Sequence, residues 1–356
     1  MEIKITRNPN PKEKPADESK LGFGKVFTDH MFLMDWDIDQ GWHDARIVPY
    51  GNLSLSPACT ALHYALEVFE GLKAYRTPEG HIQMFRPYEN ARRLWNSAER
   101  LGLPQVDPDF MVEAMKTLVE LDKDWVPHQE GTSLYIRPFL FGDDQNVGLH
   151  TLRHALFVII LAPSGMYYPQ GINPVKIMVE ENDVRAVRGG TGYTKCGGNY
   201  GASQRASVVA ESKGYTQVLW LDGVERKYIE EVGSMNMMFK IDGKIITPSL
   251  DDGSILPGIT RKSILEMLRH EGYPVEERKV ALQEVIDAAE AGKLEEAWGC
   301  GTAAVVSPVG WLFAEGKEYE INKGEIGPLT KHLYDEITSI QWGKAEDIFG
   351  WIYPVA

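Results

Sequence analysis

The sequence predicts a mixed α+β protein of two domains, and three observations support this. Its first half combines strand-like runs with two amphipathic helical stretches. A segment rich in proline, glycine and tyrosine, residues 163–171, interrupts the middle of the chain. The length of 356 residues, 43% of them hydrophobic, suffices for two ordinary cores. We place a smaller N-terminal α+β domain over residues 1–164, an interdomain loop over 165–174 and a larger C-terminal domain over 175–356.

In the first half, an extended arm over residues 1–25 precedes a set of strands and helices. Aromatic and β-branched enrichment predicts the strands, and apolar residues at helical spacing predict the helices. The strands are expected at residues 26–37, 62–74, 82–85, 133–141 and 155–161, with a hairpin turn over 77–80, and the helices at 87–101 and 109–121.

In the second half, the same signals alternate along the chain. Asp242-Gly243 is a typical hairpin turn, so the strands at residues 235–241 and 244–247 are expected to pair. Further strands are expected at residues 175–180, 216–221 and 296–300, and helices at 201–213, 259–269, 282–291 and 329–338.

Composition excludes several classes of function. A net charge of −14 repels nucleic acid, and no basic stripe with interleaved aromatics is present. The nine histidines form no HExxH motif or other close ligand spacing, so we predict no metal site. The sequence also lacks the glycine-rich signatures of nucleotide and dinucleotide binding and the GxSxG elbow of serine hydrolases.

The expected compartment is the cytoplasm. The N-terminal stretch is polar and proline-rich, unlike a signal peptide, and the longest aliphatic run, residues 155–162, is too short to cross a bilayer. The three cysteines are far apart and odd in number, which argues against a disulfide framework and suits a reducing environment. We therefore expect no membrane partner.

The stretch Lys195-Cys-Gly-Gly-Asn-Tyr-Gly201 places a primary amine beside glycines at the start of a predicted helix. An amine becomes nucleophilic when burial or a neighbouring charge suppresses its protonation, and it can then form a Schiff base with an aldehyde such as pyridoxal phosphate. Taken alone, the motif is equally consistent with a solvated lysine before a glycine turn. The interpretation depends on the other parts of such a site.

A pyridoxal phosphate enzyme also needs an acid for the ring nitrogen and a cradle for the phosphate. We select Glu231 as the acid, although the adjacent Glu230 leaves the assignment open and an exposed acid in a turn is the alternative. Leu256-Pro-Gly-Ile-Thr-Arg261 sets a glycine before a helix, where backbone NH groups can bind an anion. The small-residue turn Gly299-Cys-Gly-Thr-Ala-Ala304 is a second candidate, and either turn alone is weak evidence.

Six motifs in a fixed order resemble the branched-chain amino acid aminotransferases of the fold-type IV pyridoxal phosphate class. They are Phe69-Glu-Gly71, Tyr135-Ile-Arg-Pro138, Lys195-Cys-Gly-Gly-Asn-Tyr-Gly201, Glu231-Val-Gly-Ser-Met-Asn236, Leu256-Pro-Gly-Ile-Thr260 and Gly301-Thr-Ala303. The similarity covers residues 23–308, and Asp122-Lys-Asp-Trp-Val-Pro127 is similar to the longer form of the family. The resemblance implies the two-domain mixed α/β fold of that class, which D-amino acid aminotransferases share. It also implies that the C-terminal domain, residues 175–356, binds the cofactor and that the interdomain loop, residues 165–174, covers the active site.

The resemblance implies pyridoxal 5′-phosphate as cofactor and Lys195 as the catalytic residue that also moves a proton at the substrate Cα. It assigns the cofactor's phosphate to Arg93 and its phenolic oxygen to Tyr200. The full implied cofactor-binding set is Arg93, Lys195, Tyr200, Glu231, Ser234, Asn236, Ile259, Thr260 and Thr302.

The resemblance also implies the substrate residues. An apolar wall accepts the aliphatic side chain, Arg137 and tyrosine hydroxyls meet the γ-carboxylate of glutamate, and the backbone at Thr302 and Ala303 meets the α-carboxylate. For each aromatic viewed singly, plain core packing is the simpler interpretation. Val147 and Leu149 are implied to contribute across a homodimer interface. The wall comprises Phe23, Tyr64, Phe69, Tyr135 and Tyr167.

These observations predict an aminotransferase that moves the amino group of L-leucine, L-isoleucine or L-valine to 2-oxoglutarate by a ping-pong route through pyridoxamine phosphate. Its partners are small amino and 2-oxo acids. Two alternatives stay open: D-amino acid transamination or aminodeoxychorismate cleavage on the same fold, and a non-enzymatic globular binding protein. The sequence does not rank the three aliphatic substrates, because one methylene changes discrimination by only about 1 to 3 kcal/mol.

Overall fold

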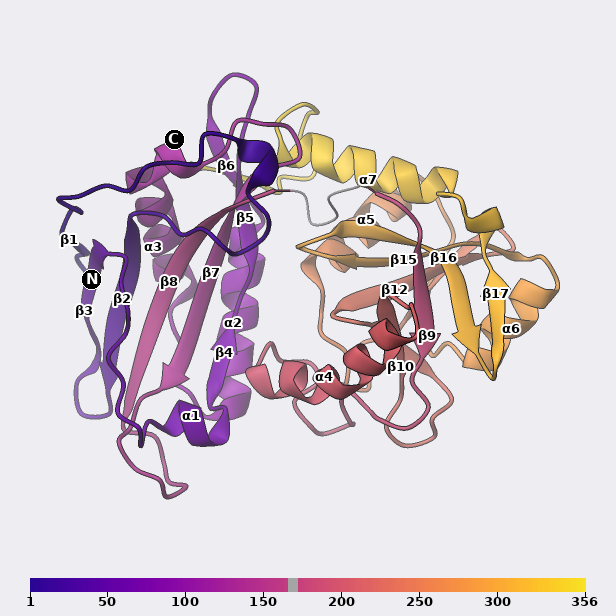
Figure 1. Ribbon diagram of the computed structural model, residues 1–356, viewed down its shortest axis with the longest axis horizontal. Coiled ribbons are helices and arrows are strands. Elements are labelled where there is room, and N and C mark those ends of the chain that lie inside the picture. The colour runs from indigo at the N-terminus through magenta and orange to yellow at the C-terminus, as the bar shows by residue number, and fades with distance from the viewer. Residues whose placement is uncertain (166–171) are drawn as a thin grey trace. The chain divides into compact units, whose positions relative to one another are not determined.

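The computed structural model describes residues 1–165 and 172–356. The chain divides into two units (Figure 1). The first comprises Met1–Pro169, Thr194–Gly197 and Ser339–Ala356, and the second comprises Gln170–Tyr193 and Gly198–Thr338. Over the described residues, each unit is built on one nine-stranded sheet that helices accompany, which confirms the predicted mixed α/β class.

The sheet of the first unit is largely antiparallel. Its strand order is β1-β3-β2-β8-β7-β5-β6-β18, and β4 pairs with β7 beside this path. The strands are β1 (Lys4–Ile5), β2 (His30–Asp37), β3 (Gly41–Pro49), β4 (Glu67–Phe69), β5 (Leu72–Arg76), β6 (Ile82–Phe85), β7 (Ser133–Gly142), β8 (His154–Ser164) and β18 (Ile352–Pro354).

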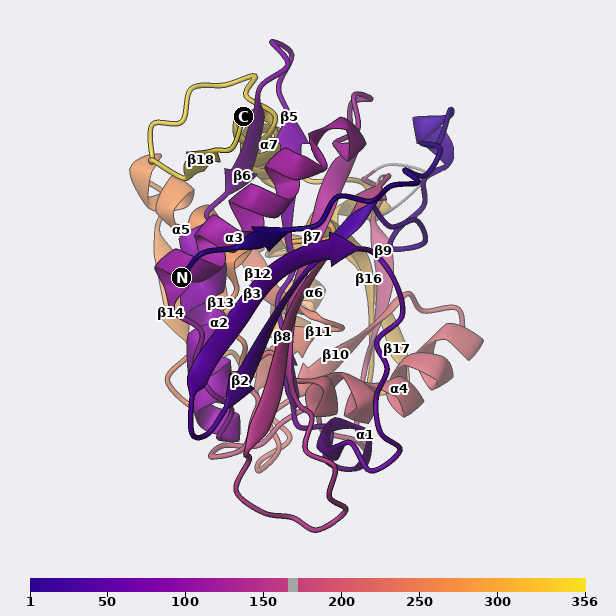
Figure 2. The same cartoon turned by 90° about the vertical axis from the view of Figure 1, so that its left-hand side faces the viewer.

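Helices α2 (Pro87–Leu101) and α3 (Pro108–Leu121) lie against one face of this sheet (Figure 2). Both match the predicted helices, because their apolar residues repeat at helical spacing. Ala91, Leu94 and Ala98 of α2 are buried in one core with the sheet residues Phe32 and Phe157. This packing fixes the buried face of α2, which also carries the polar residues Asn90, Arg93 and Ser97.

The expected strand over residues 62–74 is partly wrong. The structure has a short helix, α1 (Thr60–Tyr64), and then two separate strands, β4 and β5. A tertiary contact fixes this turn, because the backbone NH and the hydroxyl of Thr60 both donate to the carbonyl of Asp144, at 3.0 Å each. Ala65 ends the helix in the left-handed conformation. The predicted hairpin between β5 and β6 is confirmed.

The sheet of the second unit has the order β11-β10-β9-β16-β15-β12-β13-β14, with β17 paired to β16 and a further pairing of β11 with β12. The hairpin over Asp242-Gly243 joins β12 and β13 as predicted. The strands are β9 (Val175–Val179), β10 (Gln217–Leu221), β11 (Ile229–Val232), β12 (Met235–Ile241), β13 (Lys244–Pro248), β14 (Val275–Arg278), β15 (Leu294–Gly301), β16 (Val305–Ala314) and β17 (Lys317–Glu320).

The remaining helices follow the predicted pattern with shifted ends. Helix α4 begins four residues earlier than expected, directly after Cys196, so Asn199 and Tyr200 lie inside its first turn. The helices are α4 (Gly197–Ser212), α5 (Ile259–His270), α6 (Leu282–Glu290) and α7 (Pro328–Gln341), and the 3-10 turns are η1 (Glu18–Lys20), η2 (Lys123–Trp125) and η3 (Asn322–Gly324).

The last residues depart from the predicted domain division, which assigned everything after residue 174 to one domain. Strand β18 pairs antiparallel with β6 of the first sheet, where Ile352 lies opposite Phe85. Trp351 packs edge-on against Phe85, with ring centroids 5.5 Å apart. The predicted interdomain loop falls largely on residues outside the described part of the chain.

Candidate active site

The predicted site residues fall into two groups, one in each unit, and each group is described within its own unit. In the first unit, the backbone of Lys195 is held from two sides. Its carbonyl accepts a hydrogen bond from the NH of Phe69 at 2.9 Å, and its NH donates to Oγ of Ser97 on α2 at 3.0 Å. Cys196 forms an antiparallel bridge with Val68. The backbone that carries the Lys195 side chain is therefore hydrogen-bonded to both β4 and α2.

The amine of Lys195 lies in an environment that disfavours its charged form. Its Nζ is 4.9 Å from the centroid of the Phe69 ring. The pKa of Lys195 is lowered from 10.5 to about 8, chiefly by burial and also by the positive charge of Arg93, while Glu70 and Tyr135 oppose these effects. Near neutral pH, an appreciable fraction of this amine is consequently unprotonated and able to attack a carbonyl carbon.

Arg93 is buried on α2 and makes a two-point ion pair with Glu70. Its Nε donates to Oε1 at 2.7 Å, and its Nη2 donates to Oε2 at 2.9 Å. Glu70 directly follows β4 and is fully buried. The sequence motif contained Glu70, but we assigned it no role. The contact with Arg93 becomes visible only in the folded chain, because Arg93 lies on a different element, α2.

The aromatic residues predicted to line the substrate wall gather only in part. Phe23 meets Tyr135 edge-on, with ring centroids 4.8 Å apart. The guanidinium of Arg137 lies 4.8 Å from the Phe69 ring centroid, and its Nη2 donates to the Tyr135 hydroxyl at 3.0 Å. Nε of Arg137 is buried and has no hydrogen-bond partner among the described residues. A buried donor of this kind suits an anionic group of a ligand.

Three further predicted residues, Tyr64, Val147 and Leu149, are exposed. The hydroxyl of Tyr64 donates to the carbonyl of Val147. Val147 and Leu149 lie on the loop between β7 and β8. Tyr167 lies outside the described residues, so its predicted role in the wall stays a prediction.

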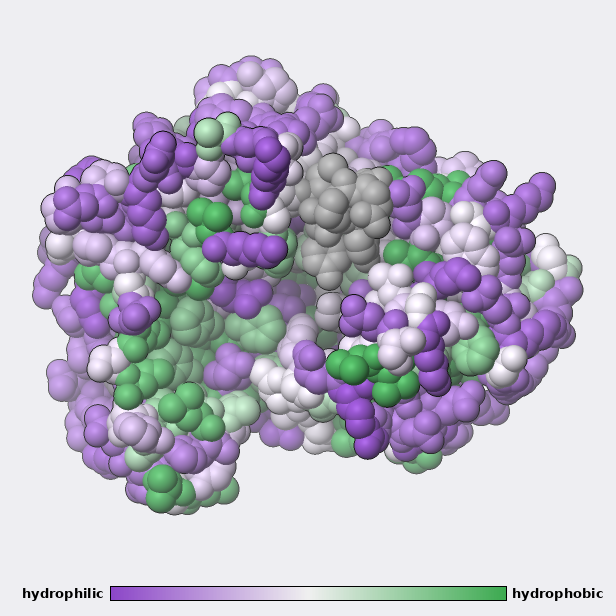
Figure 3. Space-filling model, viewed as in Figure 1, coloured by the Kyte–Doolittle hydropathy of each residue, from purple (hydrophilic) through white to green (hydrophobic). Residues whose placement is uncertain are grey.

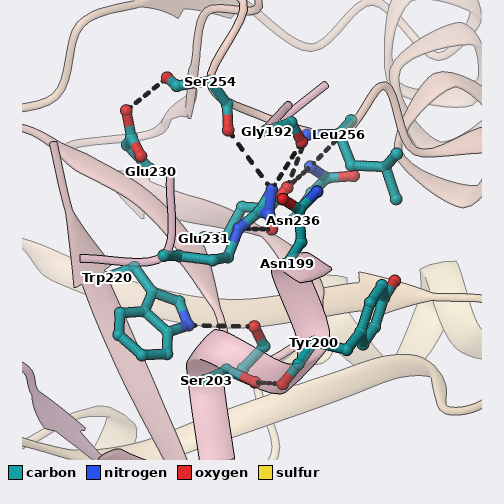
Figure 4. A network of polar contacts seen from close by, with 12 residues as sticks. Gly192, Asn199, Tyr200, Ser203, Trp220, Glu230, Glu231, Asn236, Ser254 and Leu256 are labelled. Atoms are coloured by element: carbon teal, nitrogen blue, oxygen red, sulfur yellow. Dashed lines mark hydrogen bonds and ion pairs between the residues drawn. The ribbon is translucent and has the colours of Figure 1, made fainter. Parts of the chain in front are cut away.

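In the second unit, Glu231 is buried on β11 and both of its carboxylate oxygens have partners (Figure 4). Oε2 lies 2.7 Å from Nε of Arg185, and Oε1 accepts from the NH of Leu256 at 2.8 Å. Asn236 approaches Oε1 at 3.5 Å and donates to the carbonyl of Leu256 at 2.9 Å. These donors favour the ionised carboxylate.

Arg185 was not among the predicted residues. Its Nη2 donates to the carbonyls of Gly192, at 2.9 Å, and Ser254, at 3.3 Å, which fixes the guanidinium beside Glu231. The neighbouring acid, Glu230, instead accepts a hydrogen bond from Ser254, and burial raises its pKa. The two adjacent acids thus have different environments, and only Glu231 pairs with a cation among the contacts described here.

The candidate anion cradle begins at Gly258, the N-cap of α5. A side chain at Gly258 would clash, because a Cβ there would lie 1.9 Å from Oδ1 of Asn236. Ile259 and Thr260 follow as the first buried residues of the helix, where backbone NH groups lack partners within the helix. Asn236 links this helix start to Glu231 and, through strand register, to Cys300 on β15.

The remaining predicted cofactor residues differ in position. Thr302 and Ala303 directly follow β15 and are partly buried. Tyr200 lies in the first turn of α4, where its carbonyl accepts from Ser203 at 2.7 Å. Ser234 is exposed in the turn between β11 and β12, so no contact described here joins it to the Glu231 group.

The donor set fits pyridoxal phosphate. In the first unit, Lys195 offers an amine of lowered pKa that suits the cofactor's aldehyde, and Arg93 offers a cation that suits a phosphate. In the second unit, the carboxylate of Glu231 suits the ring nitrogen, and the NH groups at the start of α5 suit an anion. Arg93, Glu231 and Thr260 are buried and Lys195 is partly buried. Neighbouring side chains or backbone hold Arg93, Glu231 and Lys195 in place, as a preorganised site requires.

The profile of the family "Amino-transferase class IV" matches residues 67–310 of this chain. The chain is 53% identical over 356 residues to branched-chain-amino-acid aminotransferase 2 of Bacillus subtilis (strain 168), covering 100% of this chain and 96% of that protein. It is also 53% identical over 350 residues to a probable branched-chain-amino-acid aminotransferase of Staphylococcus aureus (strain N315), covering 98% and 97% of the two chains.

Solved structures agree with these similarities. A branched-chain amino acid aminotransferase of Escherichia coli superposes with a TM-score of 0.75 at 26% identity, covering 91% of this chain and 99% of that one. The branched-chain amino acid aminotransferase of T.th., complexed with N-(5′-phosphopyridoxyl)-L-glutamate, also has a TM-score of 0.75, at 27% identity, covering 91% and 98% of the two chains.

Proposed function

This chain belongs to the class IV aminotransferases, and from that premise we propose that it transfers the amino group of L-leucine, L-isoleucine or L-valine to 2-oxoglutarate. The observation that carries the chemistry is the amine of Lys195, whose pKa is lowered to about 8 in a buried environment. Relatives that are 53% identical over nearly the whole chain carry the branched-chain name. Neither alternative on the same fold is favoured by these relatives.

Pyridoxal phosphate, when bound, supplies an aldehyde that takes up the amino group and a ring that accepts electrons. Lys195 provides the neutral amine for that aldehyde, and it later holds or returns the proton at the substrate Cα. The carboxylate of Glu231, which Arg185 stabilises, keeps the ring nitrogen of the cofactor protonated. The buried position of Glu231 and the partly buried position of Lys195 support these roles.

For the phosphate, the first unit offers the guanidinium of Arg93, and the second unit offers the NH groups of Ile259 and Thr260 and the hydroxyl groups of Thr260 and Thr302. These assignments follow the sequence resemblance. The roles of Tyr200, Ser234 and Asn236 as further cofactor contacts rest on the sequence resemblance. Asn236 has structural support, because it is buried and bonded to the loop that precedes α5.

The substrate side chain is assigned to the surface formed by Phe23, Phe69 and Tyr135, which can bury an aliphatic group. Arg137 is assigned to the γ-carboxylate of glutamate, supported by its buried Nε, which has no hydrogen-bond partner in the described part of the chain. The α-carboxylate is assigned to the backbone at Thr302 and Ala303. Because Arg137 contacts two of the wall's rings, the same wall of the first unit can receive an aliphatic or an acidic side chain.

A homodimer is part of the proposal. Leu149 is 79% exposed and Val147 63% exposed, and Leu62 on the adjacent helix α1 is 64% exposed. Hydrophobic residues also gather on the visible face of the first unit, over β7 and β8 (Figure 3). Large exposed apolar residues near one another favour coverage by a second copy.

We also place the protein in the cytoplasm. The three cysteines, Cys59, Cys196 and Cys300, are free and buried, as suits a reducing compartment. No helix among the described residues is long and apolar enough to cross a membrane.

A spectral half-reaction titration tests the function. We expect the purified protein to absorb visible light with pyridoxal phosphate bound, and the band to change on addition of L-leucine, L-isoleucine, L-valine or L-glutamate but not of D-leucine. Borohydride should fix the cofactor to Lys195. Lys195→Ala should abolish turnover, and Arg93→Ala should mainly weaken cofactor retention. A colourless protein that ignores added cofactor would contradict the proposal.

A further inference from the structure

Glu70 is a carboxylate with no solvent exposure at all, placed between β4 and α2 in the first unit. Its backbone NH donates to the carbonyl of Pro138 on β7 at 2.7 Å, which anchors it to the sheet. An ionised group in such a position is stable only when several donors surround it. The proposed chemistry gives Glu70 no direct task.

Four donors converge on this carboxylate. Nε and Nη2 of Arg93 contact its two oxygens at 2.7 and 2.9 Å. The amide of Asn90 donates to Oε2 at 2.8 Å, and the NH of Gly71 approaches the same oxygen at 3.2 Å. Asn90 itself is 2% exposed and also approaches the carbonyl of Gly71, at 3.3 Å. The carboxylate is therefore locked in one orientation.

The two-point ion pair fixes the direction of the Arg93 guanidinium. A guanidinium is planar and carries five NH donors, and the two bonds to Glu70 engage the edge formed by Nε and Nη2. Because the plane is rigid, holding this edge also determines where the opposite edge points. Glu70 thereby sets the orientation of the whole group.

The same helix face also holds Lys195. Asn90, Arg93 and Ser97 follow one another at intervals of three and four residues on α2, so they share one face. Ser97 accepts the hydrogen bond from the NH of Lys195, and Phe69, the residue before Glu70, donates to its carbonyl. Glu70 therefore lies between the segment that binds the backbone of Lys195 and the helix that carries Arg93.

We propose that Glu70 is a positioning residue that orients the guanidinium of Arg93 for binding the phosphate group of the cofactor. This rests on the proposed function, in which Arg93 binds that phosphate. Geometry and charge make opposite predictions here. Removing a carboxylate beside Arg93 would by charge alone strengthen the binding of a phosphate dianion. If orientation dominates, removal weakens that binding.

The test compares the binding of two aldehydes to the full chain after its cofactor has been removed. In Glu70→Gln, we expect the dissociation constant for pyridoxal 5′-phosphate to rise about tenfold or more, and that for pyridoxal, which lacks the phosphate, to stay within about twofold. Absorbance titration gives both constants without any turnover. Glu70→Asp keeps the charge but shortens the side chain, and it should also weaken only the phosphate-bearing ligand.

Glu89→Gln is the matched control, because it removes one acid from α2, the helix that carries Arg93, at a partly exposed position where Oε1 lies 3.6 Å from Nη1 of Arg92. It should leave both dissociation constants unchanged. Tighter binding of pyridoxal 5′-phosphate by Glu70→Gln, an unchanged constant, or equal losses for both aldehydes would overturn the proposal. If Glu70→Gln does not fold, the same comparison on Glu70→Asp and on Asn90→Ala, which removes one donor to Glu70, decides the matter.

Failure of the proposed function is a separate outcome. In that case the unsubstituted protein itself would take up no pyridoxal 5′-phosphate. If the unsubstituted protein binds it and the Glu70 variants bind it equally well, only the positioning role is wrong.

Discussion

Nε of Arg185 lies 2.7 Å from Oε2 of Glu231, and both side chains are buried. Arg185 reaches this position because its Nη2 also bonds two backbone carbonyls, those of Gly192 and Ser254. The pair therefore joins the loop that follows β9 to the strand that carries the acid. A buried pair of this kind is costly to break, since the remaining partner keeps its charge without compensation.

Arg185→Met should therefore destabilise the protein strongly. Removing one partner of a buried ion pair typically lowers the free energy of unfolding by about 3 to 5 kcal/mol. Urea unfolding, followed by circular dichroism, measures the change. Arg188→Met is the matched control, because Arg188 pairs with Asp252 at 3.0 Å on the surface, and exposed pairs contribute only about 0 to 1 kcal/mol. If both variants lose the same small amount of unfolding free energy, the buried pair contributes no more to stability than the exposed pair does.

The amine of Lys195 should become reactive at lower pH than an ordinary lysine. Its folded pKa is about 8 instead of 10.5, so its neutral fraction rises mainly between pH 7 and 9. The pKa of Lys20 is raised by Asp17, so Lys20 provides an internal contrast. Reductive methylation of the cofactor-free protein, read residue by residue by mass spectrometry, gives a pH midpoint for each lysine. A midpoint for Lys195 as high as that of Lys20 would contradict the proposed nucleophile.

Arg137→Met should separate the two kinds of substrate. The residue contacts the rings of Phe69 and Tyr135, so methionine retains much of the apolar surface. Loss of a charged hydrogen-bonding group should reduce kcat/KM for 2-oxoglutarate roughly 10- to 100-fold, with little change for L-leucine. Stopped-flow half-reactions measure each substrate separately. Arg153→Met, at an exposed site in the same unit, serves as the control, and equal losses for both substrates would refute the assignment.

Local periodicity explains which elements the sequence predicted well. Helix α2 occupies the expected residues 87–101 because its apolar residues face one core. The hairpin between β12 and β13 follows from Asp242 and Gly243, both of which adopt positive φ. In both cases, the residues that determine the element are close neighbours in the sequence.

The pairing of β18 with β6 could not be predicted in the same way. Ile352 and Phe85 are far apart in the sequence, and no periodic signal links them. Helix α1 was missed for a related reason, since Asp144 from a distant loop fixes its first residue. Contacts between distant segments outweigh local preference at both places.

The candidate site shows the same limit. Lys195 and Glu231 were predicted because each stands in a motif with a chemical rationale, and Arg93 because the family resemblance implies it. The partners Glu70 and Arg185 contact Arg93 and Glu231 only in the folded chain. Residue type within a motif predicts which group reacts or binds, whereas the residues that orient that group become visible only when the elements are packed.

Leu149→Asp should dissociate the proposed dimer. Leu149 is 79% exposed, near the loop contact in which the Tyr64 hydroxyl donates to the carbonyl of Val147. Burying a leucine stabilises by about 1.5 to 3 kcal/mol, and a twofold interface loses this contribution twice, so dissociation should be favoured on the order of 100-fold or more. Sedimentation velocity at several concentrations measures this equilibrium. Val224→Asp is the control at a valine that is 73% exposed in the second unit. If Leu149→Asp leaves the dimer as intact as Val224→Asp does, the loop that carries Leu149 is not part of the interface. A buried aspartate without a partner would weaken any interface that contained it.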